Sequence, residues 1–145
     1  MELYNYFRGG EIMDFDPNCV FCQKQPSDYV LENKLVIAFW DIHPVSKGHL
    51  LIIPKRHVTQ VWDVTDAEKA ELVQMIADAK KLLDAKFEPD GYNVTINSGA
   101  AAGQSVFHCH IHLIPRYWNK VTKRVGAIPG QFLVPKSRPE FKDLK

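Results

Sequence analysis

The sequence predicts an α+β fold in which an antiparallel sheet carries one long helix. Three strand-like runs precede a single helical stretch and two more follow it, so helices do not alternate with strands as they do in a parallel sheet. A length of 145 residues suits one domain, and no internal repeat suggests another. We therefore expect one domain over residues 17–118, an N-terminal arm over 1–16 and a basic, proline-containing tail over 119–145.

The first half of the predicted sheet comes from apolar, β-branched runs separated by turn residues. Asp16-Pro17-Asn18-Cys19 is a turn sequence and places the first cysteines on a tight bend. Asn33-Lys34 separates the first two runs, and Pro54 ends the third. These three strands are expected at residues 29–32, 35–40 and 49–53.

The helix has the clearest start signal in the chain. Thr65 and Glu68 form a capping box, and apolar residues then recur at helical spacing to about Phe87. Pro89-Asp90-Gly91 ends the pattern. Two strands are expected after it, at 92–97 and 106–114, joined by the small-residue loop 98–103 and ended by Pro115.

Charge and composition exclude several classes of protein. The formal net charge of +1 gives no overall attraction to nucleic acid or to an acidic membrane, although the tail is basic. No stretch approaches the length of a membrane span, and the N-terminus has no apolar run of signal-peptide length. Three cysteines form no disulfide framework. We expect a soluble, cytoplasmic protein without a membrane or nucleic-acid partner.

Three alternate histidines stand out in the last predicted strand, at positions 108, 110 and 112. Alternate residues of a strand share one face and lie roughly 6.5–7 Å apart. Two neighbours could share a metal ion, but the outer pair, about 13 Å apart, could not easily do so. The spacing therefore predicts divided roles, although a fortuitous histidine-rich strand or a simple metal site stays open.

The residues just before the histidines suit phosphate binding. Gln104 and Ser105 follow a glycine-containing loop, whose backbone N–H groups could cradle a phosphate. A neutral imidazole is a usable nucleophile near pH 7. Together these features indicate chemistry on a phosphate group.

The segment Gly103–Arg116, which contains His108-Cys109-His110-Ile111-His112, resembles the signature of the histidine triad (HIT) family. Ala38–Ile42, Lys47–His57 and the loop at Asn97 agree with the same family in order and spacing. The resemblance covers about residues 19–116 and is most similar to a bacterial zinc-containing branch described as diadenosine polyphosphate hydrolase-like. It implies the HIT-like fold: a five-stranded antiparallel sheet, one long helix and a short N-terminal helical segment.

The resemblance also implies a mechanism. His110 would attack an α-phosphate to give a nucleotidyl-histidine intermediate, which water then hydrolyses. His112 would contact the phosphate or the leaving-group oxygen, and His49 would support the triad; the alternative for His49 is a hydrogen-bonded core histidine.

Nucleotide contacts follow from the same resemblance. Asp41 would bind the ribose hydroxyls, unless it is only a turn residue. Asn97, Gln104 and Ser105 would lie at the phosphates or sugar. Phe39, Ile42 and Ile37 are candidates for the nucleobase slot and equally for the core.

The Cys19/Cys22 pair is ambiguous by itself, because a C-x-x-C sequence can hold a metal, act in redox chemistry or remain two free thiols. The resemblance implies that Cys19, Cys22, His57 and His108 bind a structural zinc ion, which would leave His110 free. Cys109 would face away from the triad as a small core residue.

The function implied is that of a nucleotide hydrolase or nucleotidyl transferase. Its substrate would contain AMP, as a dinucleoside polyphosphate such as Ap4A or a nucleoside phosphoramidate, and the family implies a homodimer. A nucleotide-binding regulatory module with little turnover is the main alternative. A third reading, removal of adenylate from DNA ends, is disfavoured by the near-neutral charge and the lack of a DNA-binding domain.

Overall fold

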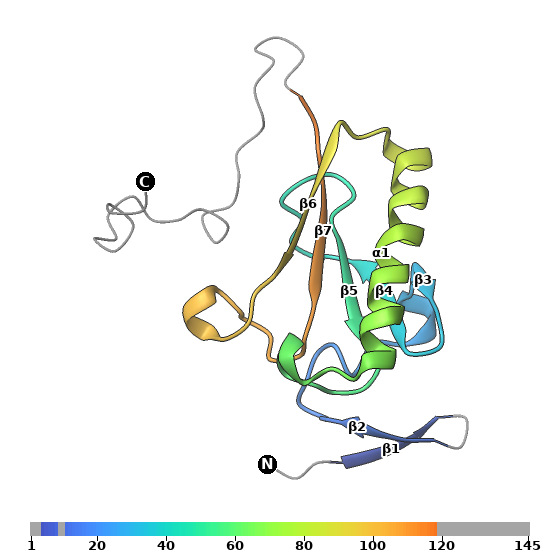
Figure 1. The fold of residues 1–145 in the computed structure, drawn as a ribbon, viewed down its shortest axis with the longest axis vertical. Coiled ribbons are helices and arrows are strands. Elements are labelled where there is room, and N and C mark those ends of the chain that lie inside the picture. The colour runs from blue at the N-terminus through green and yellow to red at the C-terminus, as the bar shows by residue number, and fades with distance from the viewer. Residues whose placement is uncertain (1–3, 9–10, 119–145) are drawn as a thin grey trace.

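The computed structural model describes residues 4–8 and 11–118. An antiparallel sheet of five strands, in the order β3-β4-β5-β7-β6, carries one long helix on one face (Figure 1). The predicted α+β class is therefore confirmed. The elements are β1 (Tyr4–Arg8), β2 (Glu11–Phe15), η1 (Pro26–Asp28), β3 (Leu31–Glu32), β4 (Val36–Trp40), β5 (Leu50–Pro54), η2 (Val61–Asp63), α1 (Asp66–Phe87), β6 (Gly91–Ile96), η3 (Ala100–Ala102) and β7 (Ile111–Arg116).

The long helix begins where the capping box predicts. The Thr65 side chain accepts a hydrogen bond from the Glu68 backbone N–H, and the Glu68 side chain accepts one from the Thr65 N–H. Buried residues then follow at helical spacing, and α1 packs on β3, β4 and β5. The helix ends at Phe87, as predicted, with Glu88 in the left-handed conformation at φ 49°. It is not long and apolar enough to span a membrane, nor is any other described helix.

One strand prediction was wrong at both ends. The strand expected at 106–114 is β7, and it runs from Ile111 to Arg116, so His108 and His110 precede the sheet. β6 ends at Ile96, opposite Ile111, and β5 continues to Pro54 but pairs with β7 only from Ile52 and Ile111. Before Ile111 the chain leaves the β5 register, because the Cys109 N–H donates to the Val58 carbonyl at 2.7 Å. Pro115 has no backbone N–H to donate, and it is tolerated because β7 has no β5 partner beyond Leu113. The other four strands lie within two residues of their predicted bounds.

The N-terminal arm contains more regular structure than its sequence suggests. Strands β1 and β2 pair as an antiparallel hairpin outside the main sheet (Figure 1). The backbone of β2 meets the end of β5 through a hydrogen bond from the His57 N–H to the Asp14 carbonyl, at 2.7 Å. The tail of residues 119–145 lies outside the described residues.

A buried ion pair joins the start of α1 to the loop after β5. Arg56 Nη2 donates to Glu68 Oε1 at 2.8 Å, and the Glu68 side chain is 4% exposed. Burial opposes ionisation of Glu68, but hydrogen bonds from Arg56 and from the Thr65 N–H leave its pKa below the usual value. Arg56 also lies 3.5 Å from Asp14 of β2, so one guanidinium links helix, loop and hairpin.

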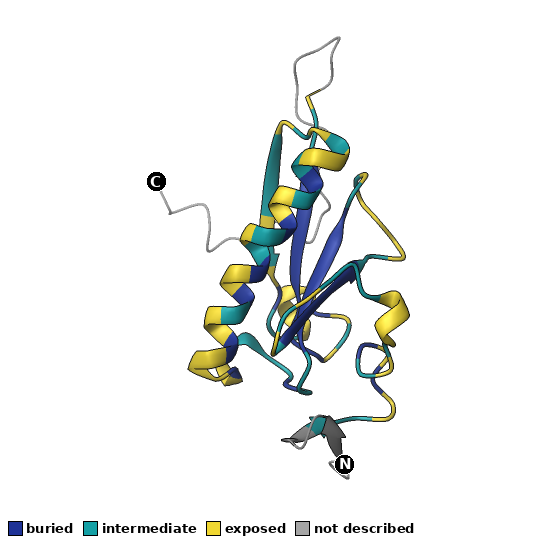
Figure 2. Ribbon diagram, turned by 90° about the vertical axis from the view of Figure 1, so that its right-hand side faces the viewer, coloured by how far each residue is buried: buried dark blue, intermediate teal, exposed yellow. Residues whose placement is uncertain are grey.

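The two faces of the sheet carry different clusters of buried side chains. The face under α1 forms the larger hydrophobic core, which includes Cys109 as predicted. Figure 2 shows this core as buried positions between helix and sheet. The opposite face carries Phe39 and Leu51 beside Cys19 and Phe21, which follow the hairpin. The functional side chains gather on this second face.

Candidate functional site

A row of paired residues crosses the face of the sheet opposite the helix. Phe39 of β4 pairs with Leu51 of β5, which pairs with His112 of β7. This row forms part of the wall of a cavity of about 470 Å³, a size suited to a small ligand. Its other lining residues are Val20, Phe21, Lys24, Asp41, Ile42, His43, Val45, His49, Ser105, Val106 and His110.

His110 is held in one tautomer by the backbone before it. Its Nδ1–H donates to the His108 carbonyl at 2.8 Å, so the lone pair of the neutral ring lies on Nε2. The side chain is buried and lines the cavity. His110 therefore presents the site with an imidazole nitrogen that can act as a nucleophile.

A hydrogen-bond chain fixes the tautomers of His49 and His112. The Val45 N–H donates to His49 Nδ1 at 3.2 Å, so His49 carries its proton on Nε2. That proton is shared between His112 Nδ1 at 2.9 Å and Asp41 Oδ2 at 3.4 Å. His112 then carries its own proton on Nε2, where it is a donor.

Burial keeps these histidines neutral. It lowers the pKa of His49 and of His110, and it lowers the pKa of His112 to about 4 with help from the neighbouring His110 and His49. The rings of His110 and His112 lie 4.9 Å apart, close enough for both to reach one phosphate. Near pH 7 the site offers a lone pair on one histidine and a proton on the next.

Gly48 lets the chain enter β5 with His49 in this position. Its φ of 87° lies in the left-handed region, which glycine adopts at little cost. A Cβ there would lie 2.8 Å from the Phe87 ring and 3.2 Å from Pro115. The close approach of this loop to α1 and β7 therefore requires glycine.

A second group of side chains lies beside the triad. The ligand atoms of Cys19, Cys22, His57 and His108 all lie within 4.8 Å of one another, and the group could hold a metal ion. Cys22 Sγ is 3.3 Å from His57 Nδ1 and 3.5 Å from His108 Nδ1. Tetrahedral zinc with ordinary bond lengths places sulfur and nitrogen about 3.6 Å apart, so the spacing fits.

The surroundings of the group also suit a cation. His108 Nε2–H donates to the Pro54 carbonyl at 2.8 Å, which directs the Nδ1 lone pair toward the two sulfurs. The other nitrogen of His57 lies 4.0 Å from Asp16 Oδ2. The hydrogen bond between the two side chains lowers the pKa of Cys19 and raises that of Cys22.

Phe21 connects the two groups. It lies between the cysteines in sequence and meets the ring of His108 edge-on at 6.0 Å and that of His110 at 5.2 Å. Sequence reasoning missed this residue, although its place inside the C-x-x-C segment could have suggested it. Val20, Lys24, Leu51 and Val106 were also missed as lining residues.

The predicted phosphate contacts occupy different positions. Ser105 lines the cavity, whereas Gln104 is buried in the loop behind it. Gln104 accepts from the Gly99 N–H at 2.8 Å and donates to the Thr59 carbonyl at 2.8 Å. Asn97 is also buried and donates to the Gly103 carbonyl at 3.5 Å. In the structure these two amides brace the loop that carries Ser105.

The predicted ribose and base contacts mostly line the cavity. Asp41 does so and also accepts from the His43 N–H at 2.9 Å, as a turn aspartate would. Phe39 and the exposed Ile42 also line the cavity. Ile37, the third candidate for the base slot, lines a smaller neighbouring cavity instead.

Comparison with known proteins identifies one family. The model of the HIT domain matches residues 23–119. The chain is 36% identical over 131 residues to an adenosine 5'-monophosphoramidase of Schizosaccharomyces pombe, covering 88% of this chain and 92% of that protein. It is 36% identical over 107 residues to an AP-4-A phosphorylase of Mycobacterium tuberculosis, covering 73% of this chain and 54% of that protein. The crystal structure of a HIT family member from Bacillus subtilis matches with a TM-score of 0.65 at 40% identity, covering 77% of this chain and 80% of that one.

Proposed function

The chain belongs to the HIT family, and from this we propose that it is a nucleotide hydrolase or nucleotidyl transferase that works through a covalent nucleotidyl-His110 intermediate. The observation that carries the proposal is the hydrogen bond from His110 Nδ1–H to the His108 carbonyl, which leaves the nucleophilic lone pair on Nε2. Relatives named for Ap4A and for an adenosine phosphoramidate support both substrate classes. In both, a nucleoside α-phosphate carries a leaving group.

The first step forms a bond from His110 Nε2 to the α-phosphorus and breaks the bond from phosphorus to the leaving oxygen or nitrogen. His112 Nε2–H, which the chain through His49 places on that nitrogen, donates a hydrogen bond to the leaving atom and stabilises the charge that develops there. A polyphosphate leaves as its anion, and an amine takes its proton from water. Water then attacks the same phosphorus, loses a proton to solvent and breaks the N–P bond. The products are a nucleoside monophosphate, the leaving group and the original histidines.

The rest of the cavity positions the nucleotide. Ser105 lines the cavity and would donate its hydroxyl to the phosphate, and Asn97 and Gln104 would act through the loop that they hold. Asp41 has acceptor capacity left for the ribose hydroxyls, because a carboxylate offers about four lone-pair sites. The base would pack against Phe39 and Ile42, which line the same cavity.

Turnover of Ap4A, Ap3A and an adenosine phosphoramidate by metal-defined protein tests this function. Release of a nucleoside monophosphate from at least one of them is expected. Tight AMP binding with no hydrolysis of any would instead support the regulatory module.

Asp41→Ala is expected to weaken AMP binding by roughly 1–3 kcal/mol, the scale of hydrogen bonds to a charged group. The loss should be much smaller for the 2',3'-dideoxy analogue, because that ligand has no hydroxyls to lose. Calorimetric titration of both ligands against wild type and variant measures the difference. Equal losses would mean that Asp41 only holds the turn at His43 and the ring of His49.

We propose zinc for the group of Cys19, Cys22, His57 and His108. Two thiolates and two imidazoles form a closed set of four ligands, so zinc here would fasten the N-terminal bend to the sheet and supply no chemistry.

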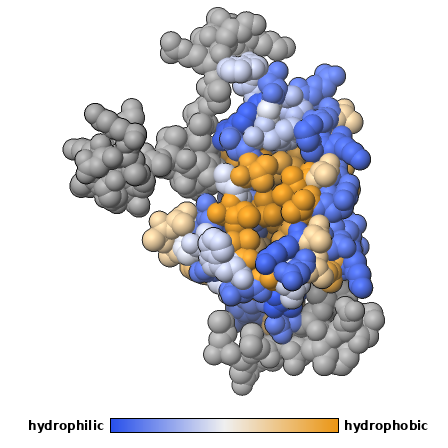
Figure 3. Space-filling view, in the orientation of Figure 1, coloured by the Kyte–Doolittle hydropathy of each residue, from blue (hydrophilic) through white to orange (hydrophobic). Residues whose placement is uncertain are grey.

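We also propose that the protein is a homodimer. Helix α1 packs on β3, β4 and β5 and leaves much of β6 uncovered on that face of the sheet. There Val94 is 49% exposed and Ile96 is 39% exposed. Figure 3 shows a broad apolar patch on this side of the molecule, which a second copy would cover.

Val94→Lys is expected to convert the dimer to a monomer, because a buried interface would have to desolvate the added charge. Light scattering after gel filtration should give half the wild-type mass. Ser27→Lys, which adds the same charge at an exposed residue before β3, the strand at the opposite edge of the sheet from β6, should leave the mass unchanged. A monomeric wild type would end the proposal.

A further inference from the structure

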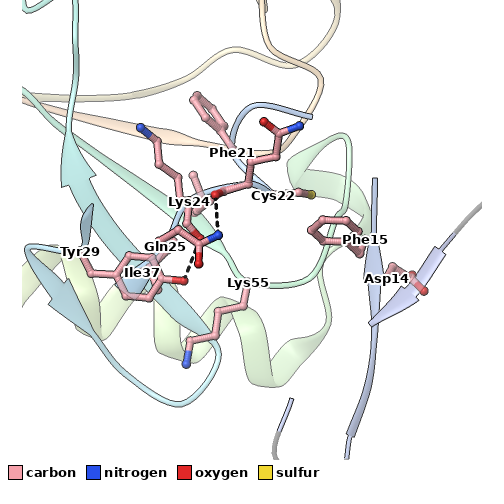
Figure 4. Close-up of a pocket in the computed structure, with 11 residues that line it drawn as sticks. Asp14, Phe15, Phe21, Cys22, Lys24, Gln25, Tyr29, Ile37 and Lys55 are labelled. Carbon is pink, nitrogen blue, oxygen red and sulfur yellow. Dashed lines mark hydrogen bonds between the residues drawn. The ribbon is translucent and has the colours of Figure 1, made fainter. Parts of the chain in front are cut away.

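One lysine lies in the wall of the main cavity, beside Phe39. Lys24 follows the C-x-x-C bend by two residues and lines both this cavity and a smaller one of about 190 Å³ beside it. Figure 4 shows the smaller cavity: the Lys24 side chain extends to the same side as Phe21, whereas Lys55 extends the opposite way. The Lys24 ammonium therefore belongs to the side that the triad occupies.

The ammonium of Lys24 is held by an aromatic ring. Its Nζ lies 4.7 Å from the centroid of Phe39, the buried residue predicted for the nucleobase slot. Lys55, by comparison, is paired with Glu32 at 2.7 Å. Within residues 14–118, whose side chains are described, no carboxylate lies within 4.0 Å of Lys24 Nζ. Its hydrogen-bond capacity is thus available to a ligand.

Lys24 is the only lysine or arginine among the described residues that line the main cavity. Val20, Phe21, Phe39 and Ile42 present apolar side chains to the same cavity. A planar base packed against Phe21 and Phe39 would come within reach of the Lys24 ammonium, which lies over the Phe39 ring. That group donates hydrogen bonds and cannot accept them.

This chemistry distinguishes between purines. Guanine and hypoxanthine present two acceptors, O6 and N7, on one edge, whereas adenine presents N7 beside an amino donor. A lysine ammonium can donate hydrogen bonds to both O6 and N7 of guanine or hypoxanthine. With adenine it can bond only N7, and it is repelled by the neighbouring amino group.

We propose that Lys24 is a specificity-determining residue that makes the site prefer 6-oxopurine nucleotides, those of guanine and hypoxanthine, over adenine nucleotides. The inference rests on the proposed function and names the base class within it. AMP still binds through its ribose and phosphate, but less tightly than GMP or IMP.

Equilibrium titration of the full-length protein with GMP, IMP and AMP tests the inference. Wild type is expected to bind GMP and IMP about ten-fold or more tighter than AMP, since hydrogen bonds to a charged group are strong. Lys24→Met should remove this preference by weakening GMP and IMP while leaving AMP within about two-fold. Lys24→Arg keeps a donor-only cation and should keep the preference. Lys34→Met, at an exposed lysine outside the cavity, is the matched control.

A second ligand isolates the contact itself. 7-Deaza-GMP lacks the N7 acceptor, so it should bind wild type more weakly than GMP does but bind Lys24→Met equally well. A wild type that prefers AMP, or has no preference, would overturn the inference. So would a Lys24→Met variant that loses affinity for all three nucleotides equally, because the ammonium would then act on phosphate or on the pocket wall. If wild type binds none of the three, the proposed function itself fails.

Discussion

His110→Ala is expected to lower turnover by roughly 10⁵-fold or more, because removal of the nucleophile closes the covalent route. AMP binding should change only modestly, since the ribose, base and Ser105 contacts remain. His112→Ala should be less severe, at about 10²–10⁴-fold, the usual contribution of general acid or electrostatic assistance at the leaving group. Single-turnover and steady-state rates on the best substrate of the panel measure both losses.

A folding control is needed because His110 is only 4% exposed and packs on Phe21. His110→Gln fills more of the space and removes the same nucleophile, so both variants should be inactive while their thermal unfolding stays near that of wild type. Wild-type turnover in either variant would remove the covalent mechanism.

Replacement of both Cys19 and Cys22 by serine is expected to abolish zinc binding and lower the melting temperature by about 10 °C. Binding free energy at a structural zinc site is folding free energy, so metal content and stability should fall together. Wild type purified without added metal should contain about one zinc ion per chain. Elemental analysis and calorimetry on the same samples measure both quantities.

Cys109→Ala is the matched control, because Cys109 is buried in the core under α1, where burial raises its pKa to about 11. It should lose some stability through a small cavity but keep its zinc. Full zinc occupancy in the Cys19/Cys22 double variant would show that other residues hold the metal.

Local signals in the sequence predicted the elements that carry the site. The capping box at Thr65 and Glu68 predicted the start of α1. Apolar, β-branched runs placed β4 and β5, and alternation placed β6, each within one residue. These features are local, so the chain alone reveals them.

Features that depend on distant partners were not visible. The run from Val106 to His110 alternates like a strand, but β6 has ended there and the Cys109 N–H bonds to Val58 in the loop after β5, so His108 and His110 lie before β7. The divided roles inferred from strand spacing nevertheless have a counterpart in the structure: His108 Nδ1 faces Cys19 and Cys22, while His110 lines the cavity. The two rings are oriented by hydrogen bonds to backbone carbonyls, of Pro54 for His108 and of His108 for His110, and not by the alternation of side chains along a strand.

The same limit applies to polar residues with long-range partners. The sequence suggests that Gln104 donates a hydrogen bond to a phosphate, yet in the fold its amide is hydrogen-bonded to Gly99 and Thr59. The Arg56–Glu68 pair and the contact between Lys24 and Phe39 join residues 12 and 15 positions apart, and no local pattern indicates either. Such contacts follow from the tertiary fold.

The most direct test of the central claim is to locate the covalent intermediate. Protein mixed with substrate should be denatured at alkaline pH, because a phosphoramidate bond is labile in acid, and its peptides mapped by mass spectrometry. A nucleotidyl group on His110, absent from His110→Ala, is the result expected from the lone pair that the His108 carbonyl leaves on Nε2. An adduct on His108 or His112 would contradict that assignment, and rapid turnover with no adduct on any histidine would contradict the covalent mechanism itself.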